Sequence, residues 1–168
     1  MIDEQYSGEQ SMTWRGETTI RDRIFSALPY LLPLMYGLEF SRFLFAQFPI
    51  LTIILIPLAP LISIYQTVPF IGLVIFFALF LLVVRNQNIP HFIRFNTMQA
   101  ILLDIIIVLC SIILGILGGG LQGFILETIY NMLFLGILAA VIYSVVQSLR
   151  GHYAEIPTIS DAVYMQVP

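Results

Sequence analysis

The sequence predicts an all-α, polytopic membrane protein with four transmembrane helices plus short interfacial or re-entrant helices, and with both termini on the cytoplasmic or stromal side. Of the 168 residues, 59% are hydrophobic and only 10% are charged, whereas a soluble domain carries about 25% charged residues. Several apolar runs also reach the ~20 residues that a helix needs to cross a hydrocarbon core about 30 Å thick. The length of the chain favours a single domain.

This pattern divides the chain into a polar N-terminal segment at 1–22, a transmembrane domain at 23–149 and a polar C-terminal tail at 150–168. Thr18 or Thr19 is expected to cap a helix entered through acidic Asp22, because Thr is a common N-cap and acids favour the first turn. The first ten residues contain acids and no cation, unlike a secretory signal or a plastid transit peptide. We therefore expect a chain made in the compartment that uses it, or one that is already mature.

The first predicted span, at about 24–45, contains two prolines. Kinks at such prolines are tolerated in membranes where neighbouring groups satisfy the freed carbonyls. The apolar stretch that follows, at 48–64, is also interrupted by two prolines. This stretch is therefore a re-entrant or interfacial segment, a broken helix or a fifth span.

A second span is predicted at about 68–84. Residues 86–97 place apolar side chains on one side and polar ones on the other, which predicts a short helix lying in the membrane interface. The last two spans are predicted at about 98–117 and 124–149, on either side of a glycine-rich turn. Gly151 follows the last span as a typical helix stop signal.

Arginine supplies all seven cationic side chains, and cations near span ends are enriched on the cytoplasmic side of a membrane. With four spans, six arginines share the side of the N-terminus and only Arg42 lies on the other. A fifth crossing would place the N-terminal arginines opposite Arg85 and Arg94. We therefore expect the stretch at 48–64 to make no net crossing.

Ionisable residues at membrane depth are candidates for function, because a charge is costly to hold there. Asp104 is predicted to lie about 9 Å into its span and Glu127 about 5 Å into its span from the opposite face, so the two acids are not expected to pair. Tyr30 lies at matching depth on the first span and is a candidate hydrogen-bond donor to Asp104. Arg94, on the polar side of the predicted interfacial helix, is a candidate partner contact. A structural hydrogen bond or a solvated position is the competing interpretation for each.

No enzymatic or cofactor-binding pattern is present. The sequence contains neither GxxxxGK[ST] nor HExxH, and His91 and His152 have no second ligand at metal-binding spacing. Cys110 is the only cysteine, so no intrachain disulfide is possible. The chain also lacks the basic cluster that nucleic-acid binding requires. We expect no enzyme activity, no cofactor, no metal and no nucleic-acid partner.

Five strings in the sequence carry a family resemblance: RIFSALPYLLPL at 23–34, SIYQ at 63–66, IFFALFLLVVRN at 75–86, HFIRFNTMQA at 91–100 and RGHYAEIP at 150–157. Together they resemble the Tic-twenty family, named after the twenty-kilodalton subunit of the protein import translocon in the chloroplast inner envelope. The resemblance spans residues 13–168 and includes the polar positions. It points to the cyanobacterial or plastid-encoded branch of the family.

The resemblance implies four spans, both ends on the stromal or cytoplasmic side, and a part in moving preproteins across the plastid inner envelope or the equivalent cyanobacterial plasma or thylakoid membrane. The implied partners are other membrane-protein subunits, translocating preproteins and the lipid bilayer. Two alternatives stay open. One is a structural or assembly partner of another membrane complex, such as a photosynthetic one. The other is a small channel in which Asp104 lines a polar path.

Overall fold

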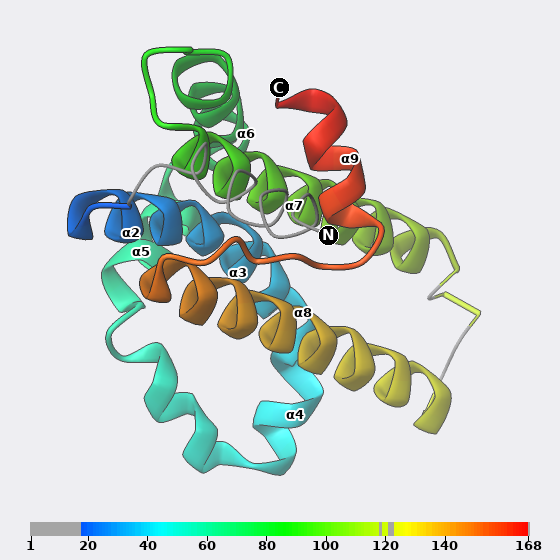
Figure 1. Cartoon of the computed structure of the whole chain (residues 1–168). Helices are drawn as coiled ribbons and strands as arrows, with labels where there is room; N and C mark the ends of the chain where they lie inside the picture. Colours follow the sequence, from blue (N-terminus) through cyan, green and yellow to red (C-terminus); the bar gives the residue numbers. More distant parts are fainter. Residues whose placement is uncertain (1–17, 118, 121–122, 168) are drawn as a thin grey trace, which may run out of the picture.

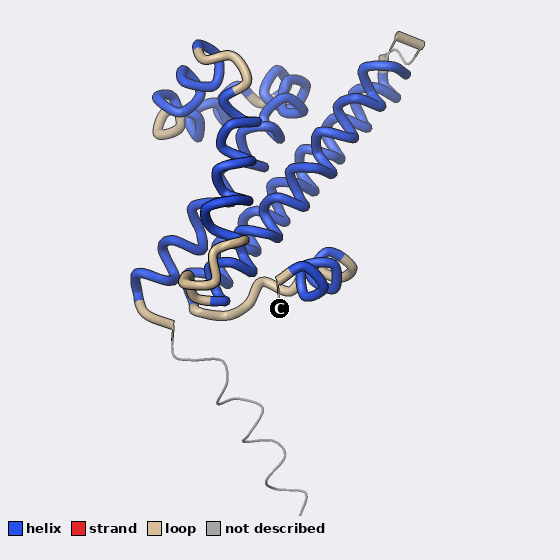
Figure 2. Tube along the Cα trace, turned by 90° about the horizontal axis from the view of Figure 1, so that it is seen from above, coloured by secondary structure: helices blue, strands red, loops and turns tan. Residues whose placement is uncertain are grey.

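The computed structural model describes residues 18–117, 119–120 and 123–167, and every regular element within them is helical. This confirms the all-α class. The longest elements are α7 (His91–Leu117) and α8 (Phe124–Arg150), each of 27 residues. At 1.5 Å per residue each is about 40 Å long, enough to cross a bilayer. Figures 1 and 2 show these two helices running in opposite directions through the molecule.

α7 is longer than the sequence indicated. We expected a separate interfacial helix at 86–97 and a span at 98–117, but one helix begins at His91 and continues through both. No helix-breaking proline or glycine lies between Pro90 and Gly115. The polar side chains of its first turns are largely buried within the bundle, so they do not mark a water-facing side.

The first apolar run folds as a series of short helical pieces. Thr19 caps the first piece, because its hydroxyl accepts a hydrogen bond from the Asp22 N–H and the Asp22 carboxylate accepts one from the Thr19 N–H. This confirms the expected cap. Proline has no N–H to donate, and around Pro29 the helix tightens to 3₁₀ geometry. The pieces are α2 (Ile20–Ala27), η1 (Leu28–Tyr30), α3 (Leu31–Gly37), η2 (Leu38–Ser41) and α4 (Arg42–Gln47).

The stretch at 48–64 contributes to two helices that meet at a sharp bend. η3 (Pro49–Leu55) and α5 (Ala59–Thr67) are bent by 81° relative to each other, at a turn that contains Pro57. This geometry fits either a broken span or a re-entrant loop. None of the described elements α4, η3 and α5 contains a buried residue.

The next apolar run is shorter than predicted. In place of a span at 68–84, α6 (Ile71–Ala78) continues into the π-helical segment η4 (Leu79–Val84). Their 14 residues rise about 21 Å, less than the ~30 Å of a hydrocarbon core.

Within the described parts of the chain, two helices are long and apolar enough to cross a membrane, or three if the bent pair η3–α5 counts as one span. The expectation of four spans is therefore met only in part. The first run is divided into pieces that are individually too short, and α6 with η4 is also too short. The four-span arrangement and its orientation stay predictions.

Beyond α8 the chain turns back along the bundle. Gly151 follows α8 with a φ of 80°, the left-handed conformation that glycine adopts at a helix end, as its position predicted. The region expected as a polar tail contains α9 (Ile159–Gln166), which packs on α7. Val163 and Val167 are buried in one cluster with Phe95, so α9 has an apolar face that belongs to the core.

Contacts at the two ends of α8 define the direction of the first run. A Cβ placed on Gly151 would meet the Thr18 hydroxyl at 2.5 Å and Arg23 Nε at 2.8 Å. At the other end of α8, the Arg42 guanidinium lies 4.2 Å from the centroid of the Tyr130 ring. The first run is thus antiparallel to α8 and parallel to α7, and α2 and α3 contact both long helices.

Candidate functional site: a buried polar network and an apolar cavity

The hydroxyl of Tyr30 is fully buried where η1 meets α7 and α8. It donates a hydrogen bond to Asn96 Oδ1 at 3.0 Å and accepts one from Gln99 Nε2 at 3.0 Å. Asn96 and Gln99 lie one turn apart on α7, and both are fully buried. Buried polar groups are costly unless they are hydrogen-bonded, so each of these side chains holds the others in place.

Serine side chains extend this network to two more helices. Ser148 of α8 donates to Asn96 Oδ1 at 2.9 Å, and Ser144 Oγ lies 3.4 Å from Gln99 Nε2. Ser160 of α9 donates to Gln99 Oε1 at 2.9 Å. The network therefore joins η1, α7, α8 and α9 at one end of the bundle. Fully satisfied buried networks of this kind favour one packing arrangement over others.

Asp104 lies eight residues after Asn96 on α7 and is almost completely buried. Its Oδ1 has no hydrogen-bond partner among the described residues. Asp104 thus lies near the middle of α7, apart from the network around Tyr30. The rings of Tyr36 and Tyr65 meet edge to face with centroids 6.2 Å apart, and the Tyr36 hydroxyl packs against Gly72.

Tyr30 does not pair with Asp104 as the sequence suggested, because its hydroxyl donates to a residue 66 positions later, Asn96. The predicted depths assumed that the third span begins at 98. α7 begins at His91 instead, and its first turns lie inside the bundle. This brings Asn96 and Gln99, rather than Asp104, level with Tyr30.

The other two candidates occupy separate surroundings. Glu127, in the first turn of α8, accepts a hydrogen bond from Gln47 Nε2 at the end of α4. Arg94 is buried, and its Nε donates to the Val84 carbonyl at 3.0 Å. Arg94 therefore satisfies a carbonyl at the end of η4, a structural contact. Roles of Glu127 and Arg94 in binding a partner stay predictions.

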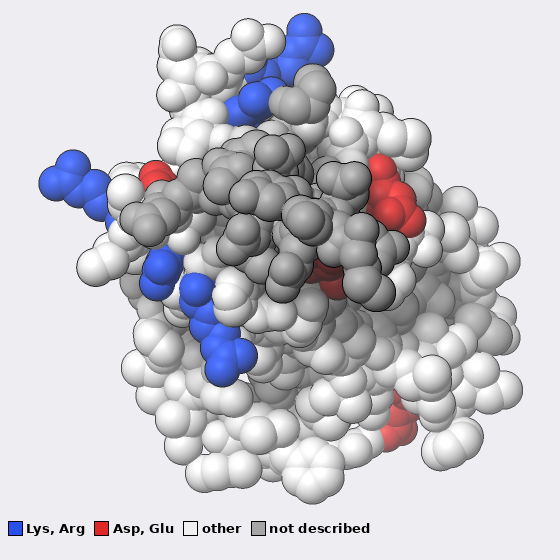
Figure 3. All heavy atoms as spheres, in the orientation of Figure 1, with Lys and Arg blue, Asp and Glu red and all other residues white. Residues whose placement is uncertain are grey.

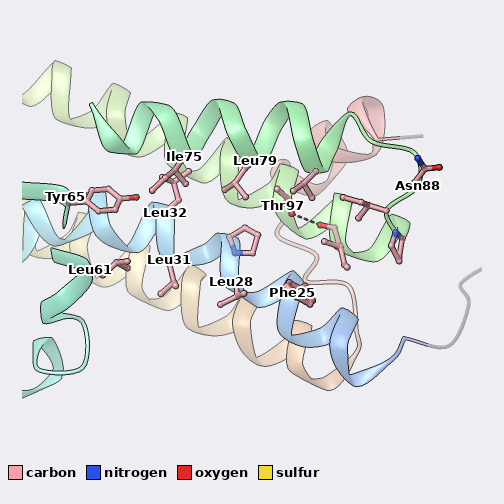
Figure 4. Close-up of a pocket in the computed structure, with 15 residues that line it drawn as sticks. Phe25, Leu28, Leu31, Leu32, Leu61, Tyr65, Ile75, Leu79, Asn88 and Thr97 are labelled. Atoms are coloured by element: carbon pink, nitrogen blue, oxygen red, sulfur yellow. Dashed lines mark hydrogen bonds between the residues drawn. The ribbon is translucent and has the colours of Figure 1, made fainter. Parts of the chain in front are cut away.

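An apolar cavity of about 450 Å³ lies between the first run and the helix formed by α6 and η4 (Figure 4). Its walls come from α2 to α3, from α5, from α6 with η4, and from the first turns of α7 with the segment that leads into them. Asn88 lies at one end of the cavity and Tyr65 at the other (Figure 4). Phe25 and Leu28 line the cavity and are about half exposed, so the cavity is open along the first run.

Positive charge concentrates at one end of the bundle. Of the six described arginines, only Arg42 lies near the start of α8. In Figure 3 the basic side chains visible on this face lie over α2, over the end of α8 and beside α6, away from most of the acidic ones. The arginines at that end are Arg21, Arg23, Arg85, Arg94 and Arg150.

Sequence reasoning missed most of the buried network. Asn96 and Gln99 are spaced i,i+3 and Ser144 and Ser148 are spaced i,i+4, so each pair lies on one face of its helix. Two such pairs on antiparallel apolar helices were a signal that these faces meet. Ser160 carried no such signal, because its position in the network depends on α9 folding back onto α7.

Comparisons with known proteins agree with one another. A family model described as "Chloroplast import apparatus Tic20-like" matches residues 12–163. A "Tic20 family protein" of Synechocystis sp. is 51% identical over 152 residues, which cover 88% of this chain and 93% of that protein. "Protein TIC 20-II, chloroplastic" of Arabidopsis thaliana is 35% identical over 154 residues, 89% of this chain and 74% of that protein. The "Tic20 family protein Ycf60" of Porphyra purpurea is 36% identical over 162 residues, 92% and 80%. Residues 12–163, which the family model matches, include every residue of the buried network and of the cavity lining.

Proposed function

This chain belongs to the Tic20 family, and we propose that it is a membrane-embedded subunit of a protein-translocation complex. In this role it aids the passage of preproteins across the plastid inner envelope or the equivalent cyanobacterial plasma or thylakoid membrane. The observation that carries the proposal is the family match over residues 12–163, to a model described as chloroplast import apparatus. Two helices of membrane-crossing length support a place within the bilayer.

The proposed topology has four crossings and both termini on the cytoplasmic or stromal side. α7 and α8 supply two crossings. The helical pieces from α2 to α4 run the length of α8, from Gly151 to Tyr130, and supply a third. α6 with η4 supplies a short fourth, which a locally thinned bilayer accommodates. The concentration of arginines at one end of the bundle supports the orientation, because cations mark the cytoplasmic side.

The two sides of the molecule suit different tasks in such a complex. The network around Asn96 and Gln99 joins η1, α7, α8 and α9 into a well-packed half. The other side consists of α4, η3 and α5, which contain no buried residue among those described. α4 packs on α8 through Arg42 and Gln47, whereas η3 and α5 have few contacts with the long helices, and such segments open and move at low free-energy cost. We infer that this flank, called here the 42–67 flank, meets preproteins and neighbouring subunits.

A second candidate function is a structural or assembly role in another membrane complex. The exposed apolar side chains of the 42–67 flank favour it, because an apolar helix face within a membrane can pack on another membrane protein as well as on lipid. A small channel with Asp104 in its path has less support, because Asp104 is buried and does not line the cavity between the first run and α6.

Conditional depletion of the protein in the organism that makes it separates the first two functions. After depletion begins, pulse-labelled preproteins destined to cross the membrane are followed beside the assembly state of the photosynthetic complexes. The translocation proposal expects unprocessed preproteins to accumulate before any complex declines. If a complex is lost first while preprotein crossing continues at its normal rate, the protein is an assembly partner and the proposal is wrong.

A further inference from the structure

The cavity between the first run and the α6–η4 helix has a shape and a size that restrict its occupant. Its apolar walls extend from Tyr65 at one end to Asn88 at the other (Figure 4). Its volume of about 450 Å³ lies within the ~300–1,000 Å³ of small-molecule sites. Because the helices around it are apolar, the proposed topology places the open side of the cavity in the bilayer.

A helix of a neighbouring protein is about 10–12 Å across with its side chains, and it can lie over the opening of the cavity. A single acyl chain is much thinner than a helix and can lie along the apolar walls.

The polarity of the walls excludes an extended peptide. Each unpaired backbone N–H or C=O costs several kcal/mol in an apolar environment. Among the residues that line the cavity, only Tyr65, Asn88 and Thr97 carry polar side-chain groups. The Thr97 hydroxyl already donates to the Ile93 carbonyl at 2.8 Å, so two side chains remain for a whole peptide backbone. A hydrocarbon chain needs no such partners.

The positive charge near the Asn88 end indicates which class of lipid carries the hydrocarbon chain. Arg85 directly follows η4, whose residue Val83 lines the cavity, and Arg21 lies one helical turn before Phe25, which also lines it. The N-terminus of α7, a favourable position for an anion, begins directly after Pro90 of the lining. Arg21, Arg85 and the N-terminus of α7 thus place positive charge within four residues of the lining at this end.

We propose that the cavity holds one acyl chain of a phospholipid from the surrounding bilayer, with the phosphate at the Asn88 end between Arg21 and Arg85. The bound lipid fills the space between the first run and the α6–η4 helix, where protein side chains do not meet. It belongs to the fold of the subunit and is independent of whether preproteins pass along the molecule.

The test uses the full-length protein in nanodiscs of phosphatidylcholine doped with phosphatidylglycerol that carries a photoactivatable diazirine on one acyl chain. Labelled residues are identified by mass spectrometry after illumination. The proposal expects strong labelling of Leu31 and Leu79, which line the cavity and are partly exposed, and weak labelling of Leu82. Leu82 is on the same helix as Leu79, is 67% exposed to the bilayer and does not line the cavity. Equal labelling of Leu79 and Leu82 in the unmodified protein shows ordinary contact with bulk lipid and overturns the proposal.

Two tryptophan variants test the cavity, one that fills it and one that leaves it open. Leu79→Trp occupies the cavity, and labelling of Leu31 should fall about tenfold, which corresponds to about 1.4 kcal/mol of binding free energy. Leu82→Trp, a matched change on the lipid-facing side, should leave labelling of Leu31 unchanged. A cavity that stays labelled in Leu79→Trp contradicts the assignment. Because Leu79→Trp can also disturb folding, thermal unfolding of both variants is measured, and the unmodified protein provides the independent test given above.

The phosphate position is tested with a diacylglycerol probe that has the same diazirine chain and no phosphate. The unmodified protein should be labelled about tenfold more by the phospholipid than by the diacylglycerol, again about 1.4 kcal/mol. The double variant Arg21→Gln with Arg85→Gln should lose that preference while keeping the diacylglycerol signal. Equal labelling by both probes in the unmodified protein overturns the headgroup assignment.

Discussion

The Tyr30 hydroxyl lies 3.0 Å from Asn96 Oδ1, and this hydrogen bond joins side chains that are 66 residues apart in the sequence. It sets the first run against α7, and Ser148 of α8 donates to the same Asn96 oxygen at 2.9 Å. Three separate parts of the chain therefore converge on one carbonyl oxygen. These two hydrogen bonds to Asn96 Oδ1 fix how far the first run, α7 and α8 are shifted along one another.

Tyr30→Phe removes the hydroxyl while keeping the ring. Asn96 Oδ1 then loses one of its two donors, and Gln99 Nε2 keeps only the weaker contact to Ser144 at 3.4 Å. We expect a loss of about 1–3 kcal/mol in the free energy of unfolding, the cost of leaving buried polar groups unsatisfied. Thermal unfolding in detergent micelles measures the change. Tyr143→Phe, at an exposed tyrosine, is the control and should change the free energy by less than about 0.5 kcal/mol. Equal stability of the two variants contradicts the network.

Ser160→Ala removes the hydrogen bond between α9 and Gln99 Oε1. We expect α9 to exchange its amide hydrogens faster, because local opening depends on local contacts, while the middle of α7 and α8 stays protected. Hydrogen exchange followed by mass spectrometry reads each segment separately. Met165→Ala, at a side chain that is 78% exposed on the same helix, should leave the exchange of α9 unchanged. Uniform acceleration across all helices would show that Ser160 acts on global stability instead.

Gly37→Ala tests the close approach of α3 to α8. The added Cβ would meet Ile137 Cγ2 at 2.7 Å, so we expect a loss of about 1–3 kcal/mol from overpacking. Gly136→Ala is the matched change on α8, where the new Cβ meets nothing within 4 Å. That variant should be as stable as the unmodified protein or more stable by up to about 1 kcal/mol, since alanine favours a helix over glycine. The same thermal assay ranks the two, and the reverse order is incompatible with the packing described.

Asp104→Asn keeps the size of the side chain and removes its charge. Because Asp104 is buried and its Oδ1 has no partner among the described residues, the ionised form is costly to hold. We expect the variant to be at least as stable as the unmodified protein at neutral pH. Chemical unfolding in micelles provides the measurement. A large loss of stability would mean that the carboxylate is held by an ionic contact, and the description of Asp104 as an unpaired group would then be wrong.

Local signals predicted several features of the fold. The capping box of Thr19 and Asp22 needs only residues within one turn, and the left-handed Gly151 needs only the end of an apolar run. The all-α class follows from the apolar runs themselves. The family followed from strings in which the polar positions also matched, and the comparisons confirm it.

Features that depend on tertiary packing were beyond the sequence. The start of α7 was predicted too late, because the polar residues of 91–97 were interpreted as facing water, whereas they are satisfied by partners on η1, η4 and α8. The same error led to the prediction that Tyr30 donates a hydrogen bond to Asp104, whereas its acceptor is Asn96. The cavity combines residues from four segments, and its existence depends on the angle between helices that no local pattern encodes.

The claim that this protein handles preproteins is tested most directly by photo-crosslinking in its own membrane. A photoactivatable amino acid replaces Ile53, an exposed residue of η3 in the 42–67 flank, or Met132, an exposed residue of α8. The captured proteins are then identified while preproteins are being translocated and again after synthesis is stopped. The account predicts that Ile53 captures several different preproteins only during translocation, and that Met132 captures far fewer. Capture of the same fixed membrane protein at Ile53 under both conditions, with no preprotein, would contradict the account and identify a structural subunit.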